Sequence, residues 1–319
     1  MAATNQWWQS AVVYQVYPRS FQDTNGDGIG DLPGVTQRLD YIKNLGVDVI
    51  WLNPIYRSPG VDNGYDISDY YDINPEFGTM TDFDKLLATA HAKGLKIMMD
   101  VVVNHSSNQN EWFKQSASSR DNPHADDYIW RDPVDGHAPN NWGAFFGGSA
   151  WEYVASRQQY YLHSFAVEQP DLNWENPKLR RAIYDMMNFW VNKGVDGFRL
   201  DVINLISKPT SFADGPQLAG EPYAPIGPMI ANGPRLNEFL QEMNDQVFAG
   251  HHLITVGETP EATVADAKQF AGLQRHELNM VFEFEHMGLD GNAAPELGKW
   301  NDQPVQLVDL KRSLTKWQN

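Results

Sequence analysis

The chain has 319 residues, 42% of them apolar and 12% aromatic, and its 24 Lys and Arg stand against 41 Asp and Glu, which gives a formal charge of −17. This is the composition of a folded globular protein, and the excess of negative charge argues against nucleic acid and anionic membrane surfaces as partners. Because the chain has no cysteine, disulfides, thiolate zinc sites and cysteine nucleophiles are excluded.

Short apolar runs alternate with stretches of helical spacing along most of the chain. Glycines stand where helix C-caps are expected, at Gly46, Gly94, Gly194 and Gly250. Such repetition, with strands apolar on both faces, predicts a parallel sheet covered by helices, and at this length a (β/α)8 TIM-type barrel. The expected strands are Val12–Tyr17, Val47–Leu52, Leu95–Val103, Val195–Val202, Leu253–Val256 and Met280–Phe284, and the expected helices are Val35–Leu45, Phe83–Ala92, Leu179–Val191 and Leu236–Val247.

One stretch interrupts this alternation. Residues 106–172 follow the third expected strand, are rich in Asn, Asp, Pro, Gly and Trp, and show no clear period. A structureless loop of this length is uncommon in a compact domain, so we interpret the stretch as an inserted subdomain beside the carboxyl ends of the strands. The expected organisation is therefore barrel in 1–105, an inserted B subdomain in 106–172, and barrel again in 173–319.

Ionisable side chains stand where three of the expected strands end. The third ends in His105, the fourth carries Arg199 and Asp201, and the fifth leads to Glu258. Catalytic residues of a (β/α) barrel lie at these ends. Alternation along a strand points Arg199 and Asp201 to one side, where the guanidinium would favour an ionised Asp201. A single aspartate at a strand end is more often a helix cap or part of a structural ion pair than a catalytic group; the ordered set favours an active site.

These segments resemble the signature regions of the α-amylase superfamily of glycoside hydrolases. Asp100–His105 is similar to the first region, Gly197–Asp201 to the second and Val256–Glu258 to the third. Tyr14–Phe21 and Asp62–Asp66 resemble the α-glucosidase branch, of the oligo-1,6-glucosidase type, and the likeness covers nearly the whole chain.

The resemblance implies a role for each matching residue. Asp201 would be the nucleophile that forms a glycosyl-enzyme intermediate, and Glu258 the general acid and base of a retaining mechanism. Val202 is similar to the residue that favours α-1,6 over α-1,4 bonds in this family, although an ordinary β-branched strand residue would look the same. Further sugar-binding positions implied by the likeness are Asp62, Tyr65, His105, Phe146, Phe165, Gln169 and Arg199, of which Tyr65 could equally be a core tyrosine.

A run of alternating oxygen ligands passes through a glycine-rich turn near the N-terminus. Gly34 occupies the place of the twelfth-position glutamate of an EF-hand, so the run is not an EF-hand. It resembles the family's single structural Ca²⁺ or Mg²⁺ loop; a metal-free turn is the alternative. The implied ligands are Asp23, Asn25, Asp27 and Asp31 through their side chains and Ile29 through its carbonyl, and no organic cofactor is expected.

The family's fourth region, Asn-His-Asp, is missing, and only six of the expected eight βα units can be counted. We therefore expect a fragment of a longer enzyme, and we expect the 319 residues alone to hydrolyse an α-glucoside poorly or not at all. The missing region leaves a catalytically inactive carbohydrate-binding protein as an alternative of another class.

The expected reaction is exo-acting hydrolysis of α-1,6 bonds in isomaltose and short isomalto-oligosaccharides. Trehalose-6-phosphate hydrolase, α-1,4-glucosidase and sucrose isomerase are the alternatives within the family. The expected partner is a neutral oligosaccharide, and we expect a monomer. No signal-peptide core occurs in Met1–Ser10 and no run approaches the roughly 20 apolar residues of a membrane span, so a cytoplasmic location is expected.

Overall fold

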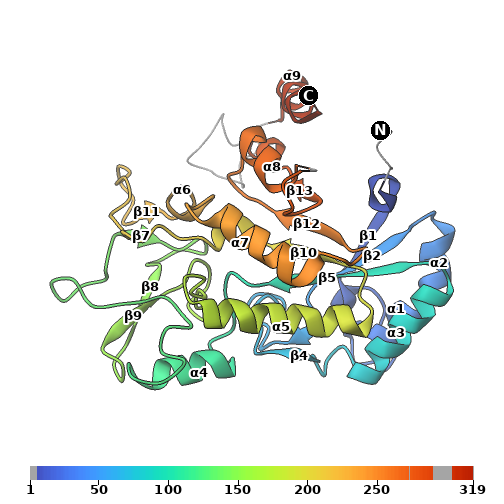
Figure 1. The fold of residues 1–319 in the computed structure, drawn as a ribbon, viewed down its shortest axis with the longest axis horizontal. Coiled ribbons are helices and arrows are strands. Elements are labelled where there is room, and N and C mark those ends of the chain that lie inside the picture. Colours follow the sequence, from blue (N-terminus) through green and yellow to red (C-terminus); the bar gives the residue numbers. More distant parts are fainter. Residues whose placement is uncertain (1–5, 273, 290–303, 319) are drawn as a thin grey trace.

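The computed structural model describes residues 6–272, 274–289 and 304–318. Its centre is a curled, six-stranded parallel sheet in the order β1-β2-β5-β10-β12-β13 (Figure 1). Each expected strand is present, shortened or shifted by a few residues at its ends, which confirms the predicted parallel arrangement. The strands are β1 (Val13–Val16), β2 (Val49–Leu52), β5 (Lys96–Val102), β10 (Gly197–Asp201), β12 (Ile254–Glu258) and β13 (Met280–Phe282).

Helices cover the outer face of this sheet (Figure 1). Capping explains where they begin: Thr79 and Asp82 form a capping box for α3 (Met80–Ala92), and Asn176 caps α5 (Pro177–Lys193). The four glycines expected at helix ends all have positive φ, between 67° and 105°.

Two expected helices are interrupted. The predicted helix Val35–Leu45 is wrong as a single element, because Arg38 leaves helical geometry at φ −97° and ψ 5° and separates α1 (Leu32–Gln37) from α2 (Leu39–Asn44). Likewise α7 (Leu236–Met243) continues as a π-helical turn, Asn244–Phe248. The helices α8 (Val264–Phe270) and α9 (Leu307–Gln318) were not expected from the sequence.

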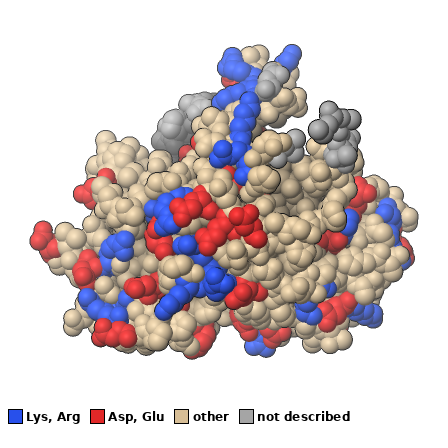
Figure 2. All heavy atoms as spheres, viewed as in Figure 1, with Lys and Arg blue, Asp and Glu red and all other residues tan. Residues whose placement is uncertain are grey.

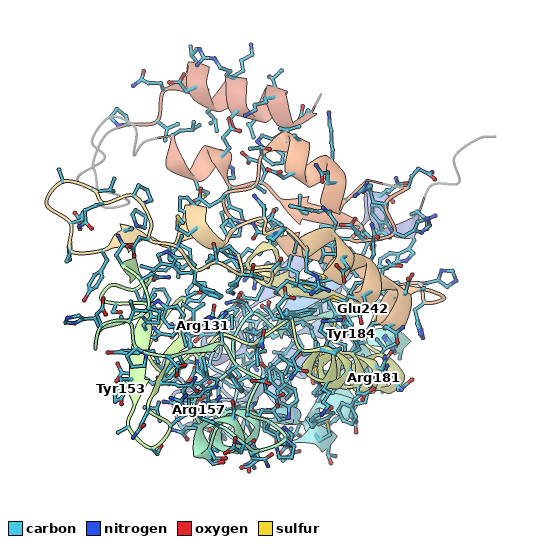
Figure 3. The ribbon with its side chains drawn as sticks, turned by 60° about the vertical axis from the view of Figure 1, so that its left-hand side comes forward. Arg131, Tyr153, Arg157, Arg181, Tyr184 and Glu242 are labelled. Atoms are coloured by element: carbon cyan, nitrogen blue, oxygen red, sulfur yellow. The ribbon has the colours of Figure 1, made fainter. Side chains whose placement is uncertain are left out.

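The stretch 106–172 is built from short elements held together by side chains. One arginine, Arg157, donates to the carbonyls of Ser119 at 2.9 Å and Ala125 at 3.0 Å and lies 4.3 Å above the ring of Trp130 (Figure 3). The strand β7 of this stretch pairs with β11, a strand in the loop that follows β10. The stretch is therefore joined to the barrel by backbone hydrogen bonds. The elements are α4 (Glu111–Ser118), β6 (Trp130–Arg131), β7 (Trp142–Gly143), β8 (Trp151–Val154) and β9 (Gln159–Leu162), with β11 at Ala224–Pro225.

A smaller hairpin and one short helix complete the carboxyl-end face. The strands β3 (Tyr56–Arg57) and β4 (Asp69–Ile73) pair in antiparallel fashion and flank the loop that carries Asp62, and α6 (Gly227–Ile230) follows β11.

A buried lysine ties stretch 106–172 to the barrel. Lys208, which is 5% exposed, makes an ion pair with the buried Asp171 at 2.8 Å and donates to the side chain of Asn104 and to the carbonyl of Leu205. Burial lowers the pKa of Lys208, and the Asp171 carboxylate opposes that shift. The ammonium therefore bridges β5, the loop after β10 and the end of the inserted stretch.

The surface is of mixed charge. On the face of Figure 2, Lys and Arg lie among Asp and Glu over α5 and α7, where Arg180 pairs with Glu242 at 2.7 Å and Arg235 pairs with Glu238. Figure 3 shows Tyr184 and Glu242 on this side, away from Arg157. Among the described residues, no helix has both the length and the apolar character that crossing a bilayer requires.

Replacing Lys208 with methionine should destabilise the fold by about 3–5 kcal/mol, because Asp171 would remain buried with no countercharge. Urea unfolding measures the change in the free energy of unfolding. Lys93→Met is the control, since Lys93 pairs with an exposed Asp40 and should contribute below about 1 kcal/mol. Equal effects of the two substitutions would contradict the role given to Lys208.

Candidate active site

The register of the parallel sheet gathers the ionisable strand-end residues. Arg199 of β10 lies beside Asp100 of β5 and Val256 of β12. Asp201 and Glu258 each follow two residues further along their strands, so their side chains point to the same side as Arg199. Neighbouring parallel strands thus bring one guanidinium and three carboxylates to one edge of the sheet.

Arg199 contacts all three carboxylates. Its Nη1 donates to Asp100 Oδ1 at 2.7 Å and to Asp201 Oδ1 at 2.5 Å, while its Nη2 donates to Glu258 Oε2 at 2.5 Å. The guanidinium carbon also lies 5.3 Å from the ring centre of Trp51. Asp201 and Glu258 thus contact the same guanidinium. A retaining mechanism needs two carboxyl groups at one site, and Arg199 holds these two together.

One positive charge faces three carboxyl groups in this cluster. Burial raises the pKa of Asp201 well above its usual value, the carboxylates of Glu258 and Asp100 raise it further, and Arg199 opposes the shift. Burial likewise raises the pKa of Asp100 to about 6, against the lowering effect of Arg199. Arg199 favours the ionised form of Asp201, as expected, but burial and the neighbouring carboxylates outweigh its effect on the pKa of Asp201.

A second hydrogen-bonded group holds Asp62, His105 and Gln169 together. Gln169 accepts from the Ala166 N–H at 3.0 Å, which fixes its amide orientation. Its Nε2 then donates to Asp62 Oδ2 at 3.0 Å and to His105 Nε2 at 3.1 Å, so this imidazole nitrogen carries no proton. Burial lowers the pKa of His105 to about 4, which keeps the ring neutral.

Tyr65 packs against the core and is anchored by its hydroxyl. The hydroxyl donates to Asp100 Oδ2 at 3.1 Å and accepts from Asn53 Nδ2 at 2.9 Å, and Asn53 in turn accepts from Gln15. The Arg199 guanidinium lies 5.7 Å from the ring centre of Tyr65. The ring is thereby fixed at the wall of the site.

A cavity of about 280 Å³ opens over these groups. Phe146 is 60% exposed, and its ring contacts that of Phe165 with centroids 5.5 Å apart. Gln169 is fully buried and supports the wall from behind. The lining residues are Asp62, Tyr65, His105, Phe146, Phe165, Arg199, Asp201, Val202 and Glu258, so the structure brings all the residues expected at the catalytic and sugar-binding positions into or against one cavity.

Sequence reasoning named Asp100 only as part of a motif and gave it no role. It is fully buried and receives hydrogen bonds from Arg199, from Trp51 at 3.1 Å and from Tyr65. The signal was present, because a lone carboxylate inside a strand that is apolar on both faces requires a partner. Lys208 had no such signal, since its partners come from distant parts of the chain.

The expected metal ligands lie in a loop that its own backbone already stabilises. Asp23 accepts from the N–H groups of Gly26 at 2.7 Å and Gly28 at 2.8 Å, and these bonds lower the pKa of Asp23. Asp27 accepts from the Ile29 N–H, while Asp31 accepts from that of Gly34 at the start of α1.

The chemistry of the loop suits a hard cation, because its donors are oxygens and the charge of Asp23 is maintained. Within the described ranges, however, no group of three or more His, Asp or Glu side chains is gathered as a metal site would require. A bound ion would therefore depend on Asn25 and the Ile29 carbonyl in addition to the acids.

Known proteins resemble this chain over its length. The family model described as "Alpha amylase, catalytic domain" matches residues 15–319. The α-glucosidase of Pediococcus pentosaceus is 59% identical over 100% of the chain and 57% of its own length, and the oligo-1,6-glucosidase of Parageobacillus thermoglucosidasius is 55% identical over 98% and 55%. The crystal structure of Bacillus licheniformis trehalose-6-phosphate hydrolase superposes with a TM-score of 0.91 at 50% identity, over 98% of this chain and 55% of that one. The chain thus spans just over half the length of these relatives.

The neutral, buried His105 makes stability depend on pH. Its folded pKa of about 4 lies below the usual 6.5, so its contribution is complete above pH 6.5 and is lost as the pH falls through about 4. Between pH 7 and 4 the wild type should lose about 3 kcal/mol more unfolding free energy than His105→Gln. Denaturant melts across this range measure the difference, with the exposed His137→Gln as control. Parallel pH profiles for wild type and His105→Gln would contradict a buried neutral imidazole.

Proposed function

The chain belongs to the α-amylase family of glycoside hydrolases, and on that premise we propose that the whole protein is a retaining, exo-acting α-glucosidase that hydrolyses the α-1,6 bonds of isomaltose and short isomalto-oligosaccharides. The observation that carries the proposal is the Arg199 guanidinium bound at 2.5 Å to each of the two carboxylates Asp201 and Glu258 at the floor of the cavity.

The proposed reaction divides the work between these two carboxyl groups. Glu258 acts as the acid and donates its proton to the glycosidic oxygen while the Asp201 carboxylate attacks the anomeric carbon, so the C–O bond to the leaving sugar breaks as the ester to Asp201 forms. Glu258, now ionised, then takes a proton from water, whose oxygen displaces Asp201. Arg199 stays in place throughout and opposes the rise in negative charge when the proton leaves.

The remaining cavity residues would bind a single terminal glucose. Asp62 and the neutral His105 offer a carboxylate and an imidazole nitrogen to sugar hydroxyls, both oriented by Gln169. Tyr65, fixed by its hydroxyl, presents a ring of the kind that packs on the apolar face of a sugar. The cavity that the described residues form measures about 280 Å³, near the lower end of the size range of small-ligand sites.

The charge of the cavity favours a neutral substrate over a phosphorylated one. Asp62, Asp201 and Glu258 line the cavity. Among the described residues that line it, Arg199 is the one cation, and it is already bound to carboxylates. A phosphate would meet carboxylates with no free countercharge among the lining residues. This argues against trehalose 6-phosphate, although a trehalose-6-phosphate hydrolase has a similar structure.

Three further properties are proposed on narrower grounds. The Asp23–Asp31 loop would bind one Ca²⁺ or Mg²⁺ for stability alone, because it lies outside the residues that line the catalytic cavity. The protein would act as a monomer, and it would work in the cytoplasm.

We expect a higher kcat/KM for isomaltose than for maltose, because Val202 shapes the cavity wall next to Asp201. Val202→Thr should lower the isomaltose-to-maltose ratio by roughly 10-fold or more, the usual effect of one wall group. Glucose release from both disaccharides and from trehalose 6-phosphate provides the measurement, and Val134→Thr, at an exposed position, is the control. A wild type that prefers maltose would refute the linkage assignment, and one that prefers trehalose 6-phosphate would refute the charge argument.

Calcium should raise the midpoint of thermal unfolding, and Asp23→Asn and Asp27→Asn should each abolish the shift, because a hard cation needs charged oxygen ligands. Titration of metal-free protein with Ca²⁺ and with Mg²⁺ measures it. Asp121→Asn, at an exposed position outside the loop, should respond as wild type does. The loop would be a metal-free turn if neither ion shifted the midpoint.

A further inference from the structure

The valine that directly follows the candidate nucleophile has a left-handed backbone conformation. Val202 has φ 36° and ψ 41°, a conformation that L residues rarely adopt and that is least favourable for a β-branched side chain. In this conformation its N–H donates to Glu258 Oε2 at 3.0 Å, so Glu258 receives a backbone donor in addition to Arg199. A strained backbone here needs surrounding structure to maintain it.

Asn204, two residues further on, supplies that structure. Its side chain is fully buried, and its Nδ2 donates to the Pro260 carbonyl at 2.6 Å and to Asn232 Oδ1 at 2.9 Å. The Pro260 carbonyl can only accept, which fixes the orientation of the Asn204 amide. The backbone carbonyl of Asn204 also accepts from the Asn232 N–H at 2.9 Å.

These bonds join the two catalytic strand ends. Asn204 belongs to the turn that follows Asp201, and Pro260 lies two residues after Glu258. Packing reinforces the junction: a Cβ on Gly257 would lie 3.0 Å from Ile203 Cγ2, so the absence of a side chain lets the turn approach β12. The turn after the nucleophile and the loop after the acid are therefore held at a fixed distance.

We propose that Asn204 is a positioning residue that holds the Val202 turn in its left-handed conformation against the Pro260 loop, and so keeps the Val202 N–H on Glu258. This inference rests on the proposed function, because it assigns to Asn204 the alignment of the acid relative to Asp201. Asn204 touches neither the cavity nor the reacting atoms; it acts through the peptide between Asp201 and Val202.

Asn204→Asp tests this with little change of shape, because it replaces the Nδ2 donor with a carboxylate oxygen that, when ionised, cannot donate to Pro260. The whole protein is assayed on isomaltose, whose leaving sugar needs a proton, and on 4-nitrophenyl α-glucoside, whose phenolate needs little help. We expect kcat/KM to fall at least roughly 10-fold more on isomaltose than on the aryl glucoside. Equal losses on both substrates would overturn the proposal, since a general loss of folded protein acts on both alike.

Glycine at position 202 provides the rescue. It adopts left-handed geometry without a steric penalty, so in a Val202→Gly background the turn needs Asn204 less. In that background, the loss of kcat/KM that Asn204→Asp causes on isomaltose should exceed its loss on the aryl glucoside by less than roughly 3-fold. Asn244→Asp is the matched control, because Asn244 makes a similar bond, to the Glu277 carbonyl at 2.9 Å, outside the catalytic junction. It should reduce both activities equally, in either background.

Denaturant unfolding of the wild type, Asn204→Asp, Val202→Gly and the double variant separates this inference from the proposed function. Asn204→Asp should lower the unfolding midpoint less in the Val202→Gly background than in the wild type. Additive effects would overturn the role of Asn204 even if hydrolysis were observed. A wild type that hydrolyses neither glucoside would refute the proposed function, while coupled midpoints would still support the hold of Asn204 on the turn.

Discussion

The site depends on one guanidinium that is bound by three carboxylates. Arg199 contacts Asp100, Asp201 and Glu258 from the centre of the parallel sheet, where the cluster is almost entirely removed from solvent. Such a cluster is costly unless each charge is opposed or neutralised, so its geometry constrains the surrounding fold. The register of β5, β10 and β12 puts the four groups in contact, and the helices on the outer face hold that register.

The same cluster defines what the site can do. It contains more carboxyl groups than positive charge, and burial together with these carboxylates raises the pKa of Asp201, one of the two groups that a retaining glycosidase requires. Asn204 and the left-handed Val202 add directionality, because they fix a backbone donor on Glu258 alone. The cavity above contains carboxylates, a neutral imidazole and aromatic rings, a combination suited to an uncharged sugar.

Sequence patterns predicted the features that depend on neighbouring residues, and they missed contacts between residues far apart in the sequence. Ionisable residues at strand ends, together with the family resemblance, named Asp201 and Glu258, because strand alternation and the order of parallel strands decide where those groups lie. The sequence did not predict the helix break at Arg38 or the two-residue strands of stretch 106–172, because a hydrophobic period cannot be recognised over so few residues. Lys208 and Asn204 carry no pattern of their own, because each acquires its role from partners that only the folded chain brings near.

The most direct test of the account is to identify the nucleophile chemically. A slow fluorinated α-glucosyl fluoride should accumulate as a glycosyl-enzyme, and peptide mass spectrometry should locate the sugar on Asp201. Glu258→Gln should slow the release of that sugar, because the base that activates water is lost. A label on another carboxylate such as Asp62, or hydrolysis that proceeds with inversion and no covalent intermediate, would contradict the mechanism built on the Arg199 cluster.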